Sequence, residues 1–401
     1  MAFRVLVILP FPWSYSRPRS RNFWPRIAAQ PDTEVTVIAH AGGDGDLPAL
    51  PVQAGLTTRF VEVGRLGAVV RTGLRFPTGQ SLRLSYADSP ALHRAVIDAY
   101  REFRPHVVYV ERLRGFPATR GIPANEVVID QTDSLPLFYQ QVLDTPGVPF
   151  VQRLIARVEG PRFARAEGRA YPTAGAVIAC TPRDAEAMAR DGHREAIDVI
   201  ANGVDLREYY PAADRPPGDP RHLVMTGNFR TLPNTDAALW LASEWPRIRE
   251  RLGAEASLTF AGGNPPPALQ QAHGRDGVSV TGYVPTLRDA YWQAGIAAVP
   301  VRLAVGTQNK LIEPLACGTL VVATPEAVAG LPEDGRAAVT VARREEFADA
   351  IAALVADPDR QALLRQRALD FVRTQLDWDI LAVKLRGVLE RVAERAHTSV
   401  R

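Results

Sequence analysis

The chain is poor in cysteine, and it lacks metal-ligand spacings of histidine and long apolar stretches. Its two cysteines, Cys180 and Cys317, lie far apart without ligand-like spacing, which argues against a disulfide framework or a zinc site and favours the cytoplasm. The seven histidines show no HxH or HExxH spacing, so none is assigned to a metal. No apolar stretch reaches the ~18 residues of a membrane span, so we do not expect an integral membrane protein.

Other function classes are disfavoured by charge and by the first residues. The formal net charge of +3 is small for 401 residues, and no register of basic and aromatic residues resembles a nucleic-acid-binding module. The opening MAFRVLVILPFPW is too short for a signal peptide and is followed by proline and tryptophan instead of a cleavage site. It predicts a first buried strand at Phe3–Leu9.

Strand-like and helix-like segments alternate along the first half, which predicts an α/β fold with parallel sheets. The expected strands are short and rich in β-branched residues, as in strands covered on both faces. They are Phe3–Leu9, Glu34–Ala39, Val107–Val110, Val127–Asp130, Ala176–Ala179 and Asp198–Ala201. The expected helices include Ser89–Phe103 and Arg153–Ala170, and the Gly/Pro-rich stretch Gly42–Gly55 is expected to be a loop.

A second series begins after Ala212–His222, a Pro/Gly/Asp-rich break typical of a linker. Its expected strands are Leu223–Thr226, Ser257–Ala261, Val278–Thr281, Ile296–Val299, Leu320–Ala323 and Ala338–Val341. Its expected helices are Asn234–Arg251, Leu287–Ala294, Asn309–Cys317, Glu345–Ala356, Asp359–Leu376 and Trp378–Arg395. We therefore predict two Rossmann-like, doubly wound domains facing a central cleft, with residues 1–205, 206–376 and a last helical segment at 377–401.

The most informative stretch is GTQNKLIEPLACG, residues 306–318. It places Lys310 and Glu313 three apart near the start of a helix that follows a buried strand, so both side chains share one helix face. This edge of a parallel sheet is where ligands bind, and helix N-termini there receive phosphates. An ammonium for a diphosphate beside a carboxylate for ribose hydroxyls suits a nucleotide-sugar, whereas the alternative is a solvated first-turn ion pair.

The strand ends of the second half share a second feature. Glycine follows the strand at Gly227, Gly262 and Gly282, and Gly306 precedes the helix bearing Lys310. Glycine at such a position lets a ligand approach backbone amides closely. Any one of these turns could be explained by a need for positive φ alone, and Asn234 is expected to cap the helix after the first of them.

Four motifs follow one another along the chain: NGVD (202–205), TGNF…PN (226–234), GY (282–283) and GTQNKLIEPLACG (306–318). In this order they resemble the GT-B-fold glycosyltransferases of family four, in particular bacterial sugar transferases with a G-x-Q-N-K-x-x-E signature. The resemblance is good from about Val199 to Leu331 and loose across the N-terminal half. It implies a retaining glycosyltransferase that needs no metal or other cofactor and takes a nucleoside-diphosphate sugar.

The resemblance also assigns roles by position. Glu313 would accept hydrogen bonds from the ribose, Lys310 and the amides around Gly227 and Thr307 would contact the diphosphate, and Lys310 would assist its departure. The turn Gly282, Tyr283, Val284 would hold the base. The complete donor set is Gly227, Asn228, Arg230, Gly282, Tyr283, Val284, Thr307, Gln308, Asn309, Lys310 and Glu313.

This sequence departs from the family pattern at two places. Asn228 and Asn234 stand near the positions of a phosphate-binding Arg and Lys, and Val305 occupies the position of an earlier glutamate. Phosphate neutralisation would then rest on Lys310 and the helix N-terminus, with Arg230 or Arg302 as candidates.

On the acceptor side the expectations come from the first domain. The segment Pro10–Arg26, interpreted as a loop, mixes arginines with aromatics, and Trp13, Tyr15 and Arg17 are its acceptor candidates. Such a loop suits sugar stacking, an anionic acceptor or peripheral contact with the inner face of a membrane. It is equally compatible with a solvated basic loop whose aromatics anchor in the core.

Three further acceptor-side candidates follow strands. Asp130 and Asp133 come at the end of one strand, where Asp133 could orient a hydroxyl or act as a base, or where Asp133 or Ser134 could cap a helix. Thr181 follows another strand and either caps the helix Arg183–Arg190 or lines the cleft.

Two other functions share this kind of fold. A non-hydrolysing sugar-nucleotide epimerase would need carboxylates and a histidine around the sugar, a set that the sequence does not present. A non-catalytic nucleotide-sugar-binding protein would tolerate the two departures. The donor base and sugar, the hydroxyl acceptor (of an exopolysaccharide, a lipid-linked glycan or a natural product) and the oligomeric state are left open.

Overall fold

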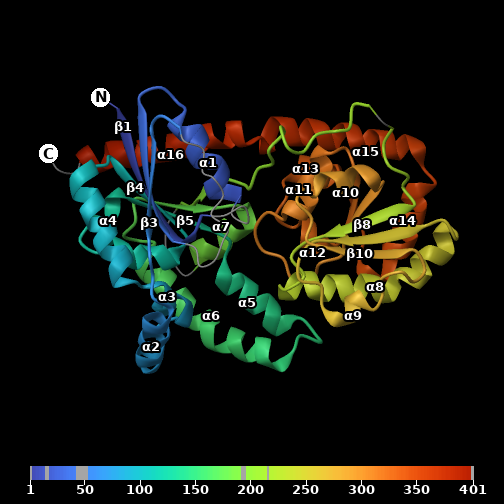
Figure 1. Ribbon diagram of the computed structural model, residues 1–401, viewed down its shortest axis with the longest axis horizontal. Coiled ribbons are helices and arrows are strands. Elements are labelled where there is room, and N and C mark those ends of the chain that lie inside the picture. Colours follow the sequence, from blue (N-terminus) through green and yellow to red (C-terminus); the bar gives the residue numbers. More distant parts are fainter. Residues whose placement is uncertain (1, 14–17, 42–52, 191–195, 215, 399–401) are drawn as a thin grey trace. The chain divides into compact units, whose positions relative to one another are not determined.

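The computed structural model describes residues 2–13, 18–41, 53–190, 196–214 and 216–398 (Figure 1). Its contacts divide the chain into two compact units. Unit 1 comprises Met1–Asn202 and Trp378–Arg401, and unit 2 comprises Gly203–Asp377. The last helix belongs by its contacts to unit 1.

Unit 1 is built on a parallel sheet of seven strands among its described residues, in the order β3-β2-β1-β4-β5-β6-β7. The strands are β1 Phe3–Pro12, β2 Thr33–His40, β3 Leu56–Val61, β4 Val107–Glu111, β5 Val127–Thr132, β6 Ala176–Ala179 and β7 Asp198–Val199. The helices are α1 Pro18–Ala28, α2 Arg65–Arg75, α3 Leu82–Ala87, α4 Pro90–Phe103, α5 Leu135–Asp144, α6 Phe150–Ala170, α7 Pro182–Ala189 and α16 Trp378–Thr398. Short turns of helix lie at Phe76–Thr78, Leu113–Thr119 and Ala124–Glu126.

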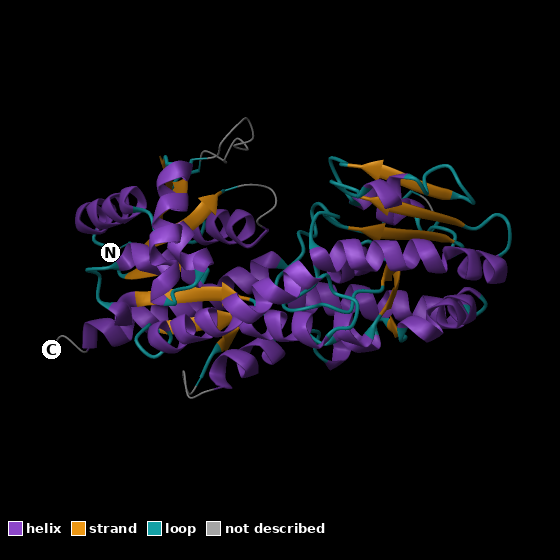
Figure 2. Ribbon diagram, turned by 90° about the horizontal axis from the view of Figure 1, so that it is seen from below, coloured by secondary structure: helices purple, strands orange, loops and turns teal. Residues whose placement is uncertain are grey.

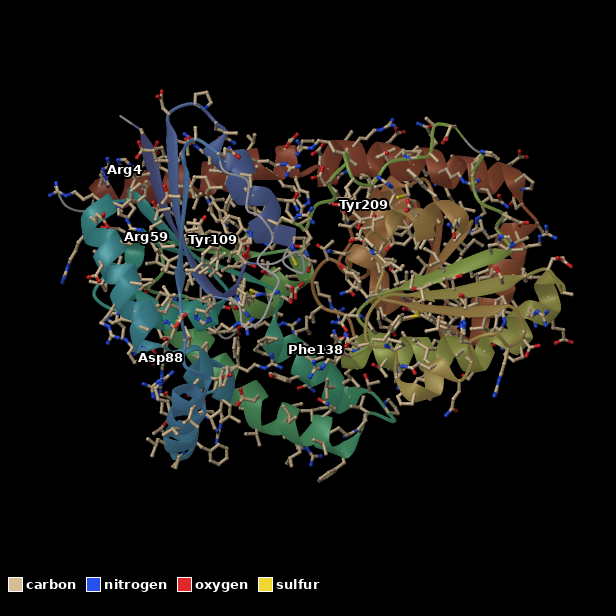
Figure 3. All side chains as sticks on the ribbon, in the orientation of Figure 1. Arg4, Arg59, Asp88, Tyr109, Phe138 and Tyr209 are labelled. Atoms are coloured by element: carbon tan, nitrogen blue, oxygen red, sulfur yellow. The ribbon has the colours of Figure 1, made fainter. Side chains whose placement is uncertain are left out.

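Helices cover both faces of this sheet, which is why its central strands are largely apolar (Figure 2). Along β1, Val5 and Val7 pack in a core with α1 and α16, whereas Leu6 and Ile8 pack in a second core with α4 and α6. Tyr109 of β4 is fully buried in the first of these cores (Figure 3). The side-chain period of two thus divides one strand between two hydrophobic layers.

Unit 2 has the same architecture. Its described strands form a parallel sheet in the order β10-β9-β8-β11-β12-β13. They are β8 His222–Thr226, β9 Ser257–Ala261, β10 Val278–Gly282, β11 Ile296–Val299, β12 Leu320–Ala323 and β13 Thr340–Val341. The helices are α8 Leu232–Leu252, α9 Pro267–Gln270, α10 Arg288–Gln293, α11 Asn309–Ala316, α12 Pro325–Val328, α13 Glu333–Ala337, α14 Phe347–Val355 and α15 Pro358–Phe371, with short turns at Arg344–Glu346 and Val372–Leu376.

The prediction of an α/β fold with two doubly wound parallel sheets is confirmed. The interpretation of Pro10–Arg26 as a loop is wrong, because β1 runs to Pro12 and α1 begins at Pro18. Most of Gly42–Gly55 lies outside the described residues. Over the part of the chain that the structure describes, no helix has the length and apolarity to cross a membrane.

Candidate functional site

Lys310 lies in the first turn of α11, and its ammonium group is held by amide oxygens. The Nζ atom donates to Oδ1 of Asn234 (2.5 Å) and to Oε1 of Gln308 (3.4 Å). The Asn234 side chain is itself fixed, since its Nδ2 donates to the carbonyl of Asn228 (2.9 Å). The ammonium is therefore positioned by hydrogen bonds to neutral side chains.

Glu313 lies one turn further along α11 and has separate partners. Its Oε2 accepts a hydrogen bond from the hydroxyl of Tyr291 (3.0 Å), which is also 2.7 Å from the hydroxyl of Thr226 at the end of β8. Tyr291 is fully buried. A solvated surface pair would not have such partners, so the first-turn interpretation of Lys310 and Glu313 is not supported.

Burial displaces the pKa of both groups toward neutrality. The pKa of Lys310 is lowered to about 8, because desolvation outweighs the favourable field of Glu313. The pKa of Glu313 is raised to about 7 by desolvation, against the hydrogen bond from Tyr291. Two ionisable groups whose pKa values are both displaced by burial, at the end of a parallel sheet, are typical of a functional site.

Glycine is required at these strand ends for different physical reasons. Gly227 and Gly262 have φ values of 152° and 141°. A Cβ atom on Gly262 would lie 2.0 Å from the carbonyl oxygen of Gly227, so these two loops pack backbone to backbone. By contrast, a Cβ atom on Gly282 would meet nothing within 4 Å, and here it is the φ of 70° that favours glycine.

The other predicted donor residues lie on loops after the strands of the same unit. Tyr283, directly after β10, is 81% exposed, and Val284 beside it is half-buried. Asn228 and Arg230 are exposed on the loop after β8, where the backbone N–H of Arg230 donates to Asn228 Oδ1 (3.1 Å). The remaining members, Thr307, Gln308 and Asn309, lead into α11, with Gln308 as its N-cap residue.

Two expectations about charge and capping in this region need correction. Asn234 is not a helix N-cap: α8 begins at Leu232 with Thr231 as N-cap, and Asn234 instead orients Lys310. Arg302 is a poor phosphate candidate, because its Nε and Nη2 are bound by the carboxylate of Asp236 at 2.9 and 2.6 Å.

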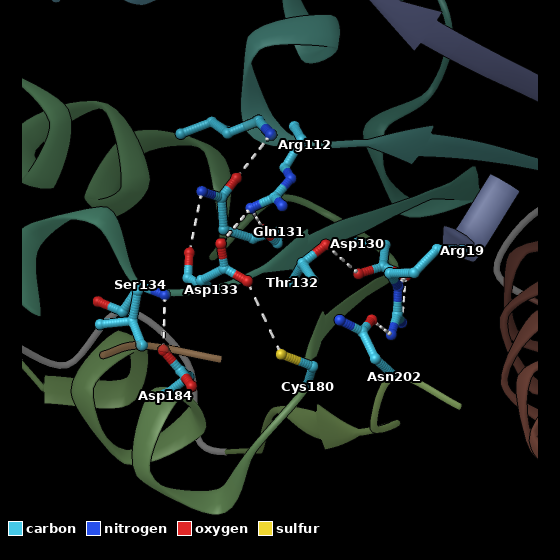
Figure 4. Close-up of polar contacts among 12 residues, drawn as sticks. Arg19, Arg112, Asp130, Gln131, Thr132, Asp133, Ser134, Cys180, Asp184 and Asn202 are labelled. Carbon is cyan, nitrogen blue, oxygen red and sulfur yellow. Dashed lines mark hydrogen bonds and ion pairs between the residues drawn. The ribbon is translucent and has the colours of Figure 1, made fainter. Parts of the chain in front are cut away.

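In unit 1, Asp130 is not an acceptor-binding residue, because it is fully buried in an ion pair (Figure 4). Its Oδ2 accepts from Arg19 Nε (3.0 Å), Arg19 Nη2 (2.6 Å) and the Tyr109 hydroxyl (2.6 Å). Arg19 is only 3% exposed and also donates to the carbonyl of Ile200 (2.9 Å). This network joins α1, β4, β5 and the end of β7, so its role is structural.

Asp133 is half-buried at the end of β5 and is paired with Arg112 (2.9 Å), whose Nη1 also donates to the carbonyl of Gln131 (3.0 Å) (Figure 4). Two non-glycine residues here have positive φ values: Arg112 itself (72°) and Thr132 (68°), which directly precedes Asp133. A β-branched residue there is strained by about 1–3 kcal/mol, and such strain clusters at functional sites. The helix N-cap is Ser134, which accepts from the N–H of Leu137, and not Asp133.

Two other acceptor candidates are structural. Trp13 is 1% exposed and belongs to the core beneath α1 and α16. Thr181 is fully buried and caps α7 by accepting from the N–H of Asp184 (3.0 Å). Tyr15 and Arg17 lie outside the described residues.

Sequence reasoning missed a cavity of about 820 Å³ at the carboxyl ends of β1, β2 and β3. Its lining includes His40, Glu62, Arg83, Tyr86 and Arg114. Burial lowers the pKa of His40 to about 4, with a smaller contribution from Arg114. Only the strand ends could have signalled this site, and β3 was not among the expected strands.

Among the described residues, no three His, Cys, Asp or Glu side chains are grouped closely enough to hold a metal ion. This concerns the protein's own residues only and does not bear on ions that a bound diphosphate would carry.

Solved structures define the class of fold. Sucrose-phosphate synthase from Thermosynechococcus elongatus matches 97% of this chain and 99% of its own, with a TM-score of 0.72 and 17% identity. A trehalose-phosphate synthase from Burkholderia vietnamiensis matches 99% and 98% with a TM-score of 0.67 and 12% identity. HepE from Anabaena, in complex with UDP and glucose, matches 97% and 99% with a TM-score of 0.62 and 15% identity. The chain has the GT-B fold.

A family model makes the class more specific for unit 2. Residues 220–357, about a third of the chain, match the model described as "Glycosyl transferases group 1". No curated protein matches the chain. The chain thus contains a group 1 glycosyltransferase domain, and the expectation of a glycosyltransferase is confirmed at that level. The matched residues include α11 with Lys310 and Glu313.

Proposed function

We propose that the chain is a retaining, metal-independent glycosyltransferase that moves a sugar from a nucleoside-diphosphate sugar to a hydroxyl acceptor. The observation that carries the proposal is the pair Lys310 and Glu313 in α11. Each is desolvated and held by its own polar partners at the carboxyl edge of the unit 2 sheet. Of the structures above, the one with UDP and glucose makes a UDP-sugar the first donor to test.

In this proposal the donor lies along the loops after β8, β10 and β11. Lys310, aimed by Asn234, contacts the diphosphate together with the amides at the start of α11. Glu313 accepts hydrogen bonds from the ribose hydroxyls. The exposed ring of Tyr283 offers a surface against which the base can stack.

The chemical step follows from this placement. The bond between the anomeric carbon and the diphosphate oxygen breaks, and the acceptor oxygen bonds to the same face of that carbon, so that configuration is retained. The acceptor proton passes to a departing diphosphate oxygen. Lys310 stabilises the negative charge that develops on the diphosphate, which is electrostatic stabilisation by a preorganised cation.

For the acceptor we propose unit 1, with Asp133 as the residue that orients the attacking hydroxyl. The Arg112 guanidinium keeps this carboxylate in one orientation, and the strained backbone at Thr132 fixes its position. The cavity at the ends of β1 to β3 replaces Trp13, Asp130 and Thr181 as the place for the rest of the acceptor.

The proposal is tested first by a donor screen. Saturation-transfer NMR with a panel of nucleoside-diphosphate sugars identifies base and sugar together, and release of nucleoside diphosphate on adding candidate acceptors measures transfer. We expect at least one donor to bind and to raise the melting temperature by mass action. A new sugar-nucleotide formed without acceptor would indicate an epimerase instead, and no binding by any donor would contradict the proposal.

The Glu313→Gln variant should chiefly weaken donor binding. Hydrogen bonds to a charged acceptor are worth about 1.5–3 kcal/mol, so the donor KM should rise roughly tenfold or more while kcat changes little. Steady-state kinetics over a range of donor concentrations measures this. Glu208, which raises the pKa of Glu313 through its charge, provides a matched control as Glu208→Gln, expected to keep a near-normal KM.

The pH profile of kcat/KM for the donor should be bell-shaped. Below about pH 7 Glu313 takes up a proton and loses its charge, and above about pH 8 Lys310 loses its proton. The Lys310→Met variant should lack the alkaline limb and Glu313→Gln the acidic limb. A profile that stays flat from about pH 6 to about pH 9 in the parent protein would count against both roles.

A further inference from the structure

We propose a second ligand site in unit 1, an arginine-lined pocket that binds the phosphate or diphosphate group of a ligand. The pocket has a volume of about 350 Å³ and lies among α3, α6 and the turns at Phe76–Thr78 and Leu113–Thr119. Its arginines are Arg75, Arg120, Arg162, Arg165 and Arg169. Neither the family match nor the donor proposal involves this region, because both concern unit 2.

The lining carries far more positive than negative charge. Of its residues, all of them within the described chain, Asp88 is the only carboxylate. Asp88, which is labelled in Figure 3, forms ion pairs with Arg75 (2.5 Å) and Arg120 (2.6 Å). Glu159 lies close by, but its Oε2 accepts from the Ser81 hydroxyl (2.8 Å) and its Oε1 from the N–H of Leu82 (2.9 Å). The three arginines of α6 thus face the pocket without an acidic partner in its lining.

Those three arginines come from one face of one helix. Arg162, Arg165 and Arg169 are spaced i, i+3 and i+7, so their side chains project in the same direction. Arg162 is held in place, since its Nη1 donates to the carbonyl of Gln80 (3.3 Å) and its guanidinium lies 4.4 Å from the ring centroid of Phe76. Like charges gathered on one helix face repel one another, and an anion between them removes that cost.

Phosphate is the anion that this arrangement fits best. Guanidinium groups bind phosphate oxygens through pairs of parallel N–H donors, which gives stronger and more directional bonds than a lysine provides. Thr78 and Ser81 add hydroxyl groups to the same lining. The volume of about 350 Å³ falls within the ~300–1,000 Å³ range of small-molecule pockets, which is compatible with a phosphate or diphosphate group.

Helix α3 separates this pocket from the cavity at the ends of β1 to β3. Ser81, Leu84 and Asp88 line the arginine pocket, whereas Leu82, Arg83 and Ala87 line the larger cavity. The two sites are therefore distinct, but they share one short helix. A ligand in the arginine pocket would fix α3 and with it one wall of the proposed acceptor cavity.

Two kinds of ligand present this chemistry, a free phosphate compound and the headgroup of an anionic lipid. Helix α2 reaches the pocket at Arg75 and exposes Leu66, Val69, Val70 and Leu74, which are 80%, 59%, 53% and 74% accessible. Apolar side chains beside a phosphate site suit the lipid, because such a helix can lie at a bilayer surface. The shared element of both ligands is the phosphate group, and the experiment separates the sources.

The test compares two probes on matched variants. Isothermal titration with pyrophosphate measures a free ligand, and flotation with phosphatidylcholine vesicles with and without phosphatidic acid measures a headgroup. The double variant Arg165→Gln/Arg169→Gln should weaken binding of at least one probe tenfold or more. Arg101→Gln, an exposed arginine of α4 outside the pocket, is the control for loss of charge. Circular dichroism checks that each variant is folded.

Lys310→Ala serves as a second control, because the proposed donor site is the other place that would hold a diphosphate. Binding at the arginine pocket should survive in Lys310→Ala and be lost in the double variant. Binding lost only in Lys310→Ala would place the probe in unit 2 and overturn the inference. It is also overturned if neither probe binds the parent protein, or if Arg101→Gln weakens binding as much as the double variant does.

Discussion

Replacing Lys310 by methionine should lower kcat about 10²–10³-fold, with a much smaller effect on the donor KM. This is the usual cost of removing one preorganised group that stabilises developing charge. The ammonium is held by amide oxygens instead of a carboxylate, so its positive charge is available to the diphosphate. An interaction that strengthens as the diphosphate departs affects turnover more than ground-state binding. Release of nucleoside diphosphate under saturating donor and acceptor measures this change.

The chain supplies a matched control, since Lys384 is its only other lysine. Lys384 is exposed on α16, and Lys384→Met should retain full activity. Methionine at 310 should leave the melting temperature unchanged or raise it, because burial lowers the pKa of Lys310 and so disfavours its charged form in the folded protein. A folded Lys310→Met variant with the parent's kcat would refute the role assigned to this residue.

Unit 2 was the more predictable part of the structure. The expected strands Ser257–Ala261, Ile296–Val299 and Leu320–Ala323 have the same bounds as β9, β11 and β12. Strands buried on both faces have short, continuously apolar sequences, and such sequences can be recognised without knowledge of the tertiary structure. The placement of Lys310 and Glu313 on one face of a helix also follows from spacing alone. Their partners, Asn234 and Tyr291, do not follow from it, because they come from other elements of the fold.

Two elements of unit 1, β3 and α1, were missed because their local sequences lack the usual signals of a covered strand and of a helix. Strand β3 lies at the edge of the sheet, and its sequence LTTRFV is largely exposed, so it lacks the apolar signal of a covered strand. Helix α1 contains two prolines and three arginines, a composition that resembles a loop. What stabilises it is distant in sequence: Arg19 finds its carboxylate 111 residues away at Asp130. Helix propensity depends on the local sequence, so it contains no information about an ion pair with such a distant residue.

The buried pair of Arg19 and Asp130 leads to the largest expected loss of stability. Asp130→Ala should destabilise unit 1 by about 3–5 kcal/mol, because it leaves a guanidinium buried without its counter-charge. A guanidinium cannot lose its proton to relieve that cost. Since native domains are stable by only about 5–15 kcal/mol, the variant is expected to be partly unfolded at 37 °C. Urea denaturation followed by circular dichroism gives the free energy of unfolding.

A double-mutant cycle measures the coupling between Arg19 and Asp130. Arg19→Met removes the guanidinium and its bonds to the carbonyls of Ile200 and Ala201, and leaves Asp130 with the Tyr109 hydroxyl as a donor. If the pair is coupled, Arg19→Met/Asp130→Ala should be more stable than the sum of the two single losses predicts, since it contains no uncompensated charge. Arg59→Met/Glu102→Ala removes an exposed ion pair of the same unit and should show little coupling. Equal coupling in the two cycles would mean that burial does not determine the effect. Reduced acceptor binding in a fully stable Asp130→Ala protein would instead restore Asp130 as a site residue.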